Sequence, residues 1–142
     1  MNDVLSIQIV FLMIAGIIAS YYDQKKGIIP NKITYSMIGI GIILSIATNN
    51  WIAFPIAGFI GLFTIGLFFL NKMGGGDGKF LIGMALIQPI YLGYVFPFIV
   101  MIVSSIICLV HNYNKKPHLF RLAPYLSVGM FITWITLFYI GG

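Results

Sequence analysis

Apolar residues dominate the chain in six long segments, which are separated by short, more polar connections. A membrane-spanning helix takes about 20 mainly apolar residues. We therefore predict an all-α chain, a polytopic bundle of six transmembrane helices. The fourth segment is short and contains Pro89, which predicts a kinked or shallow helix there. The segments cover residues 4–22, 33–47, 52–70, 80–92, 95–110 and 122–140, each to within a few positions.

The composition supports a location in the bilayer. Hydrophobic residues make up 60% of the chain and charged residues only 8%, whereas a soluble domain carries about 25% charged residues. A chain of 142 residues has room for these spans and for no separate soluble domain, so we expect one membrane-embedded domain over residues 1–142. The first segment has no basic region before it and no small-residue cleavage site after it. We therefore interpret it as a retained span rather than a signal peptide.

The basic residues define an orientation. Only three of the five connections carry them, namely those between the first and second, third and fourth, and fifth and sixth segments. With six spans these connections share one side, which the positive-inside rule makes cytoplasmic, with both termini extracytoplasmic. Five spans would put the last basic cluster on the wrong side. The basic residues are Lys25, Lys26, Lys32, Lys72, Lys79, Lys115, Lys116 and Arg121.

The remaining composition argues against several kinds of partner. The net charge of +5 comes from few, dispersed basic residues, so we expect the lipid bilayer and not nucleic acid as a partner. The single cysteine, Cys108, excludes an internal disulfide and a cysteine-based zinc site, and we predict a buried, inert thiol. We expect His111 and His118 to be solvated loop residues. No cofactor or metal is expected, and nothing in the sequence indicates an oligomeric state.

Acidic residues are rare, which makes their positions informative. The chain has three, Asp3, Asp23 and Asp77. The predicted topology puts Asp23 at the cytoplasmic end of the first span and Asp77 at the cytoplasmic start of the fourth. Two carboxyl groups held close together share one proton, so one acts as a base on water while the other polarises a carbonyl. We therefore predict an aspartic-protease dyad; the alternative is a pair of interfacial charges neutralised by nearby lysines.

Glycines surround Asp77 at positions 74, 75, 76 and 78. Because glycine disfavours helices, we predict a flexible loop whose bare backbone pairs with an extended substrate. The segment is not a Walker phosphate loop, since Met73 stands where the first glycine should be and Phe80 where a hydroxyl is needed. The dinucleotide pattern G-x-G-x-x-G fails at Lys79.

Two motifs resemble those of the type IV prepilin peptidases, which are membrane aspartic proteases of the GxGD type. The sequence GGGDGKF at 74–80 resembles the family's GxGD-x-K-[LF] segment. The sequence DQKKGIIPN at 23–31 resembles its first-aspartate segment, in which Pro-Asn follows the aspartate. The sequence PYLSVG at 124–129 is similar, more weakly, to a proline-aromatic run near the start of the last span. Together the motifs and the span count cover most of the chain.

The resemblance implies a function and a set of residues. It implies an endopeptidase that removes the basic leader of type IV prepilins or pilin-like precursors at the cytoplasmic membrane face, just before their hydrophobic segment. Longer family members also carry an N-terminal CxxC region and methylate the new N-terminus, so this chain resembles the short, peptidase-only form. The implied catalytic residues are Asp23 and Asp77, with Gly74, Gly76, Gly78, Lys79, Pro30 and Asn31 as supporting motif residues.

Several supporting residues also have structural interpretations. Pro30 is expected to end the connection and Asn31 to cap the second helix. Lys79 is expected either to lower the cost of the charge at Asp77 or to anchor the membrane interface. Four further glycines are expected to allow close helix packing, namely Gly39, Gly41, Gly58 and Gly61.

Three alternative functions stay open on the sequence. An archaeal preflagellin-type peptidase shares the same two-aspartate chemistry. A small transporter or channel would place acids deep inside the spans, whereas here both candidates lie at span ends. A secretion scaffold with an inactive dyad is the third. The presenilin and signal-peptide-peptidase type is disfavoured, because those proteins are larger and carry a Pro-Ala-Leu motif that this sequence lacks.

Overall fold

The computed structural model describes residues 2–70, 73–88, 95–112 and 122–141. In these ranges the chain forms six α-helices and no strands, which confirms the all-α prediction. The expected kink at Pro89 lies outside the described residues. The helices are α1 Asn2–Lys26, α2 Asn31–Ala47, α3 Ala53–Phe69, α4 Gly75–Ile87, α5 Phe96–Asn112 and α6 Ala123–Gly141.

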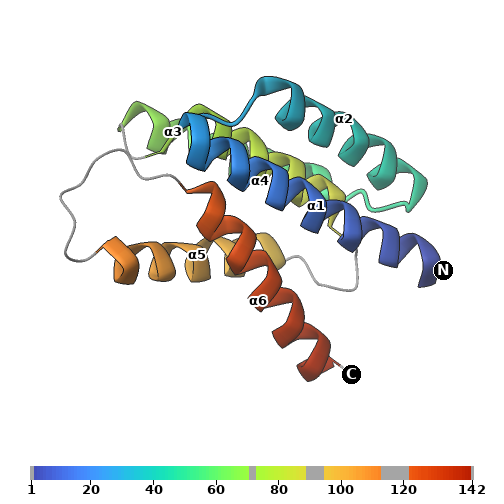
Figure 1. Cartoon of the computed structure of the whole chain (residues 1–142). Coiled ribbons are helices and arrows are strands. Elements are labelled where there is room, and N and C mark those ends of the chain that lie inside the picture. The colour runs from blue at the N-terminus through green and yellow to red at the C-terminus, as the bar shows by residue number, and fades with distance from the viewer. Residues whose placement is uncertain (1, 71–72, 89–94, 113–121, 142) are drawn as a thin grey trace.

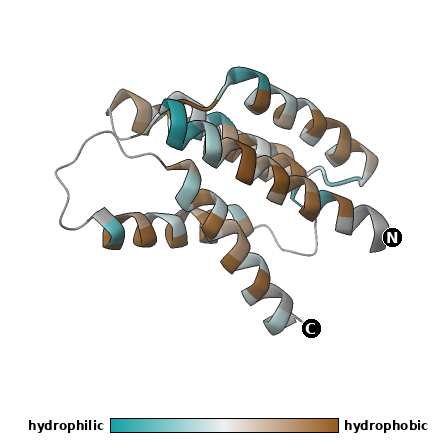
Figure 2. Ribbon diagram, in the orientation of Figure 1, coloured by the Kyte–Doolittle hydropathy of each residue, from teal (hydrophilic) through white to brown (hydrophobic). Residues whose placement is uncertain are grey.

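Successive helices run in alternating directions, so α1 ends and α6 begins at the same end of the bundle (Figure 1). The described lysines lie there: Lys25 and Lys26 in the last turn of α1, Lys32 at the start of α2, and Lys79 early in α4. We call this the lysine-bearing end. Figure 2 shows hydrophilic residues mainly near the helix ends and hydrophobic residues along the helices. The other four basic residues lie outside the described ranges.

The helices differ in how well they match the thickness of a membrane. Among the described residues, Ile7–Lys26 is long and apolar enough to cross a bilayer. Four further helices are apolar but shorter. A 17-residue helix is only about 26 Å long, somewhat less than the hydrocarbon core of about 30 Å. The six transmembrane spans and the orientation of the termini therefore stay predictions.

The six helices form two packing groups. In the first, which we call the α4 group, α4 packs along both α2 and α3. In the second, the α6 group, α6 packs along both α1 and α5. Contacts between the groups are sparse and join α1 to α2 and α4, and α4 to α5. A boundary with few contacts therefore runs through the bundle.

Close backbone approach holds the α4 group together. A Cβ atom added to Gly83 of α4 would lie 2.8 Å from Met37 Cβ of α2, and one added to Gly41 would lie 2.6 Å from Leu86 Cβ. The Ser45 hydroxyl donates a hydrogen bond to the Leu86 carbonyl at 2.7 Å. Glycine is required at both contacts because any side chain would push α2 and α4 apart.

Not every glycine has the predicted packing role. Gly41 does, but added Cβ atoms at Gly39 and Gly58 would meet nothing within 4 Å. At Gly61 the Cβ would make an ordinary contact of 3.4 Å with Ile82. The prediction was therefore wrong for Gly39 and Gly58, because they face away from the neighbouring helices.

Hydroxyl groups are prominent in the α6 group. The Ser20 and Ser127 hydroxyl oxygens, on α1 and α6, lie 2.7 Å apart, and the Ser127 hydroxyl also donates to the Gly16 carbonyl at 2.8 Å. These bonds fix α1 against α6 one turn before Asp23. The α5–α6 contact is a close approach of Gly129 to Ser104.

Candidate active site

Asp23 lies in the last turn of α1, and its position depends on how that helix ends. Gly27 adopts a left-handed φ of 69°, and its N–H donates a hydrogen bond to the Asp23 carbonyl at 2.8 Å. This is a common helix C-cap, in which glycine is favoured because it lacks a Cβ. The cap ends α1 and turns the chain inward, and the Asp23 side chain is only 4% exposed.

The connection from α1 to α2 brings the first motif onto α4. Ile29 is buried, and Pro30 is the N-cap residue of α2, with no side-chain capping bond. The prediction that Asn31 caps this helix was wrong, because α2 begins at Asn31 itself. The Asn31 side-chain oxygen instead accepts a hydrogen bond from Lys79 Nζ at 2.9 Å.

Asp77 lies in the first turn of α4, which begins at Gly75. The predicted flexible glycine loop is therefore wrong: Gly75, Gly76 and Gly78 are helical. Tertiary packing has overridden the low helix propensity of glycine. A Cβ at Gly76 would lie 3.1 Å from Ile29 Cβ, and one at Gly78 would lie 3.1 Å from Thr64 Cβ. The glycines thus let two other parts of the chain approach the start of α4.

The Asp77 carboxyl group is held by the same turn. Gly74 is the N-cap residue, in an extended conformation, and its backbone makes a hydrogen bond to Asp77. This is the half of a capping box in which a side chain three residues into the helix reaches back to the N-cap N–H. The side chain is 5% exposed, and Oδ1 has no hydrogen-bond partner among the described residues.

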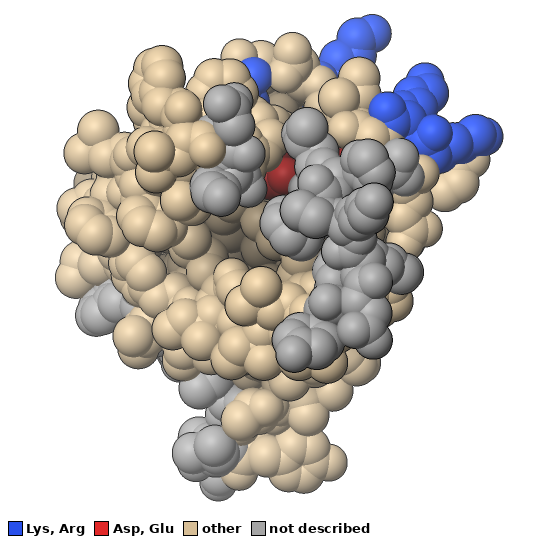
Figure 3. Space-filling view, turned by 90° about the vertical axis from the view of Figure 1, so that its left-hand side faces the viewer, with Lys and Arg blue, Asp and Glu red and all other residues tan. Residues whose placement is uncertain are grey.

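The fold brings the two aspartates together. Asp77 precedes the apolar part of α4, which starts at Phe80. The pKa of Asp77 is raised from 3.8 to about 7, chiefly by burial and in part by the nearby Asp23 charge, while the hydrogen bond from Gly74 opposes both effects. The electrostatic influence of Asp23 on this pKa indicates that the two carboxyl groups, which come from different packing groups, lie close enough to interact. Figure 3 looks onto the end of the bundle and shows acidic atoms in a recess, with lysines to one side.

Lys79 links the two motifs to each other. Besides its bond to Asn31, the ammonium group lies 4.7 Å from the centre of the Tyr35 ring. Both of these partners belong to α2, and Lys79 is not among the causes of the shifted Asp77 pKa. Sequence reasoning missed Tyr35, although it lies four residues after Asn31 and so on the same helix face.

The other candidate residues lie away from this chemistry. Cys108 is buried, as predicted. His111 belongs to the last turn of α5 rather than to a loop, and its ring centre is 5.9 Å from that of Tyr125. His118 lies outside the described residues. Within the described ranges no three His, Cys, Asp or Glu side chains are grouped as a metal site would require.

Comparison with known proteins identifies the family. Residues 10–112 match the model of the type IV leader peptidase family, so the chain belongs to that family. The match includes both aspartates and both motifs. No solved structure matches the chain.

Three curated proteins are similar to parts of the chain. Prepilin peptidase EppA of Methanothermobacter thermautotrophicus is 31% identical over 105 residues, which cover 60% of this chain and 26% of the relative. The preflagellin peptidases of Methanococcus voltae and Methanocaldococcus jannaschii are 43% and 38% identical over 82 residues, covering 53% of this chain and 35% of each relative. The matched regions thus span about a third of these relatives or less.

Proposed function

We propose that the chain is a membrane aspartic endopeptidase that removes the leader of type IV prepilins or preflagellin-type precursors, with Asp23 and Asp77 as its catalytic dyad. The observation that carries the proposal is the meeting of these two buried aspartates across the boundary between two helix groups. Membership of the leader peptidase family supports the reaction class.

The dyad is suited to hydrolysis of a peptide bond. The ionised carboxylate takes a proton from a water molecule, whose oxygen attacks the carbonyl carbon, while the protonated partner donates to the carbonyl oxygen. The tetrahedral intermediate then collapses, the C–N bond breaks, and the leaving amine takes a proton from the dyad. An Asp77 pKa of about 7 allows the pair to hold the single shared proton at neutral pH.

The proposed setting is the cytoplasmic membrane, crossed six times, with the lysine-bearing end in the cytoplasm. There the dyad meets a leader that enters from the cytoplasm. The lysines on this end would repel a basic leader, so we assign them to topology and not to substrate capture. Helix-embedded peptide bonds resist attack, so the bond to be cut must be locally extended at the dyad.

The test is cleavage of a co-expressed precursor, read by its size and by the N-terminus of the product. Prepilin and preflagellin precursors are assayed in parallel. We expect one cut by the wild type, and a loss of about 1000-fold or more in Asp23→Asn and Asp77→Asn, because asparagine keeps the shape but cannot exchange the proton. Asp3→Asn is the matched control, since α1 begins at the opposite end of the bundle, and it should cut normally. Normal cleavage by both dyad variants would refute the assignment.

A further inference from the structure

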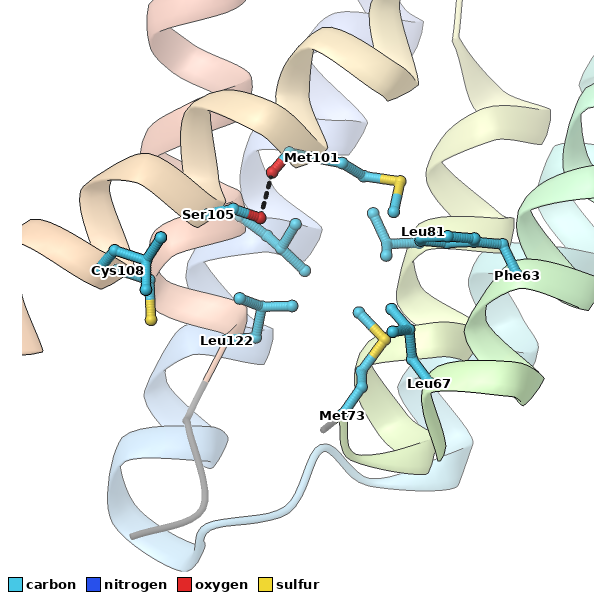
Figure 4. Close-up of a pocket in the computed structure, with 10 residues that line it drawn as sticks. Phe63, Leu67, Met73, Leu81, Met101, Ser105, Cys108 and Leu122 are labelled. Carbon is cyan, nitrogen blue, oxygen red and sulfur yellow. Dashed lines mark hydrogen bonds between the residues drawn. The ribbon is translucent and has the colours of Figure 1, made fainter. Parts of the chain in front are cut away.

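An apolar groove runs along the boundary between the two packing groups, and one end of it lies near the start of α4. Its first part, which we call the proximal cavity, has a volume of about 280 Å³ and is lined by residues of α3, α5 and α6 together with Met73 and Leu81. Figure 4 shows Met73, Leu81, Met101 and Leu122 around a common space. Met73 directly precedes the GGGDG sequence, and Leu81 lies one helical turn after Asp77. Neither aspartate is among the described lining residues, but Leu81 places one end of the cavity about one helical turn from Asp77.

A second part, the distal cavity, has a volume of about 410 Å³ and continues the groove between α3 and α5. Phe63, Met101, Ser105 and Leu109 line both cavities, so the two lie directly beside each other. Along α3 the lining runs from Leu67 to Phe59, a length of about 12 Å, or two helical turns. The groove thus has the length of a short helical segment.

The chemistry of the lining restricts what can occupy it. Among the lining residues that the structure describes, Ser105 has the one polar side chain besides the thiol of Cys108, and its hydroxyl already donates to the Met101 carbonyl at 2.7 Å. None of the described lining residues is charged, so none of them offers an ionic partner to a polar head group. Ile102 and Ile106 on the rim are 60% and 55% exposed, so the groove opens sideways, where the proposed topology places lipid.

We infer that this groove binds the apolar helical segment of the substrate that directly follows the bond to be cut. The inference rests on the proposed function. A peptide held at the dyad must continue away from it, and the nearby groove offers an apolar track of two turns. An amphipathic or apolar helix laid into such a groove is a common mode of peptide recognition.

Crosslinking tests the contact directly. In the Cys108→Ser, Asp77→Asn background, a single cysteine is placed in the groove rim by Ile106→Cys, or on the outer face of α2 by Ile43→Cys. Both isoleucines are exposed, at 55% and 67%. Cysteines are then scanned through the apolar segment of the precursor. We expect disulfides with Ile106→Cys that recur every three to four substrate residues, and none with Ile43→Cys. Equal yields at the two positions, or none at Ile106→Cys, would overturn the inference.

A kinetic test uses a groove-blocking variant. Ser105→Trp places a large side chain between both cavities, and Ser36→Trp is the matched control, because Ser36 is also exposed and bonded to the carbonyl four residues earlier. We expect Ser105→Trp to raise KM for the full precursor about tenfold with kcat little changed. A short peptide that carries the leader and cleavage site without the apolar segment should be cut equally by both variants.

The outcomes separate the groove from the activity. If the wild type cuts and the dyad variants do not, but Ser105→Trp leaves KM unchanged, the inference fails and the proposed function stands. If Ser105→Trp instead lowers only the amount of phospholipid that copurifies, the groove is a lipid site and the inference is wrong. If the wild type cuts neither precursor, the proposed function fails and the inference falls with it.

Discussion

Both packing groups combine close glycine contacts with serine hydrogen bonds, but different contacts dominate where α2 meets α4 and where α1 meets α6. In the α4 group, glycines let α2 and α4 approach until backbone and Cβ atoms touch. In the α6 group, serine hydroxyls bridge α1 and α6. Each group contributes one aspartate: Asp77 comes from the first and Asp23 from the second. The dyad is therefore assembled between two separately packed units, where helix contacts are sparse.

Because the two aspartates belong to different groups, the segment that connects the groups affects how the aspartates face each other. The chain crosses from one group to the other directly after Asp23, through the Gly27 turn and Ile29. Ile29 then packs on Gly76, next to Asp77. We infer that this short crossing, more than the packing inside either group, determines how Asp23 faces Asp77. The predictions below test the dyad, the packing inside each group and the link between the two motifs, from the largest expected effect to the smallest.

The largest expected effect is the dependence of stability on pH. The pKa of Asp77 is about 7 in the folded chain and 3.8 ordinarily. At a pH between these two values, unfolding therefore releases a proton from Asp77. The free energy of unfolding should fall as pH rises from about 4 to 7 and level off above, by up to about 4 kcal/mol. Asp77→Asn should remove this slope and be the more stable form at pH 8. Thermal unfolding of both proteins in detergent at several pH values measures this dependence. If Asp77→Asn unfolds with the same pH dependence as the wild type, Asp77 is not the buried, coupled group described here.

The next effect concerns packing inside the α4 group. Gly83→Ala should destabilise the fold by about 1–3 kcal/mol, because the new Cβ would lie 2.8 Å from Met37 Cβ. Gly58→Ala makes the same chemical change where nothing lies within 4 Å. It should be neutral or stabilising by up to about 1 kcal/mol. Chemical denaturation of both variants compares them, and equal effects would mean that α2 and α4 are not packed this closely.

Lys79 tests the link between the two motifs. Lys79→Met removes the bond to Asn31 and the contact with Tyr35, and should lower kcat about tenfold through misplacement of the motifs. The pH–rate profile should keep its position, because the contacts of Lys79 are with α2. A shift of the profile to higher pH would show instead that its positive charge acts on the dyad. Lys32→Met, a similar loss of charge at an exposed site, is the control.

The smallest effect belongs to the α6 group. Ser127→Ala removes the hydroxyl that meets Ser20 and the Gly16 carbonyl, and should cost about 1 kcal/mol. The Ser20→Ala, Ser127→Ala double variant should lose less than the sum of the single changes, because the two hydroxyls share one interaction. Ser105→Ala, an exposed hydroxyl bonded within its own helix, should change stability little. Additive losses would mean that the two serines act independently.

The sequence by itself determined where the helices form and which candidate catalytic residues lie at their ends. Apolar runs, which are local in sequence, predicted the helices to within a few positions, apart from the fourth, which begins earlier. The family motifs identified Asp23 and Asp77 as candidates. The proline at 30 was also expected to end the connection between α1 and α2, and it is the N-cap residue of α2.

Only the tertiary structure decided which helices meet and what the motif residues do. Helix partners depend on shape, so although the sequence predicted the Asp23–Asp77 dyad, it did not reveal that α4 packs along α2 and α3 or that α3 and α5 leave a groove. Propensity predicted a loop at 74–78, but the packing of Ile29 and Thr64 against bare glycines makes these residues helical. Asn31 was expected to cap a helix and instead binds Lys79. In each case a contact between residues far apart in sequence overrode a local preference, because burial and close packing outweigh the small energies of intrinsic propensity.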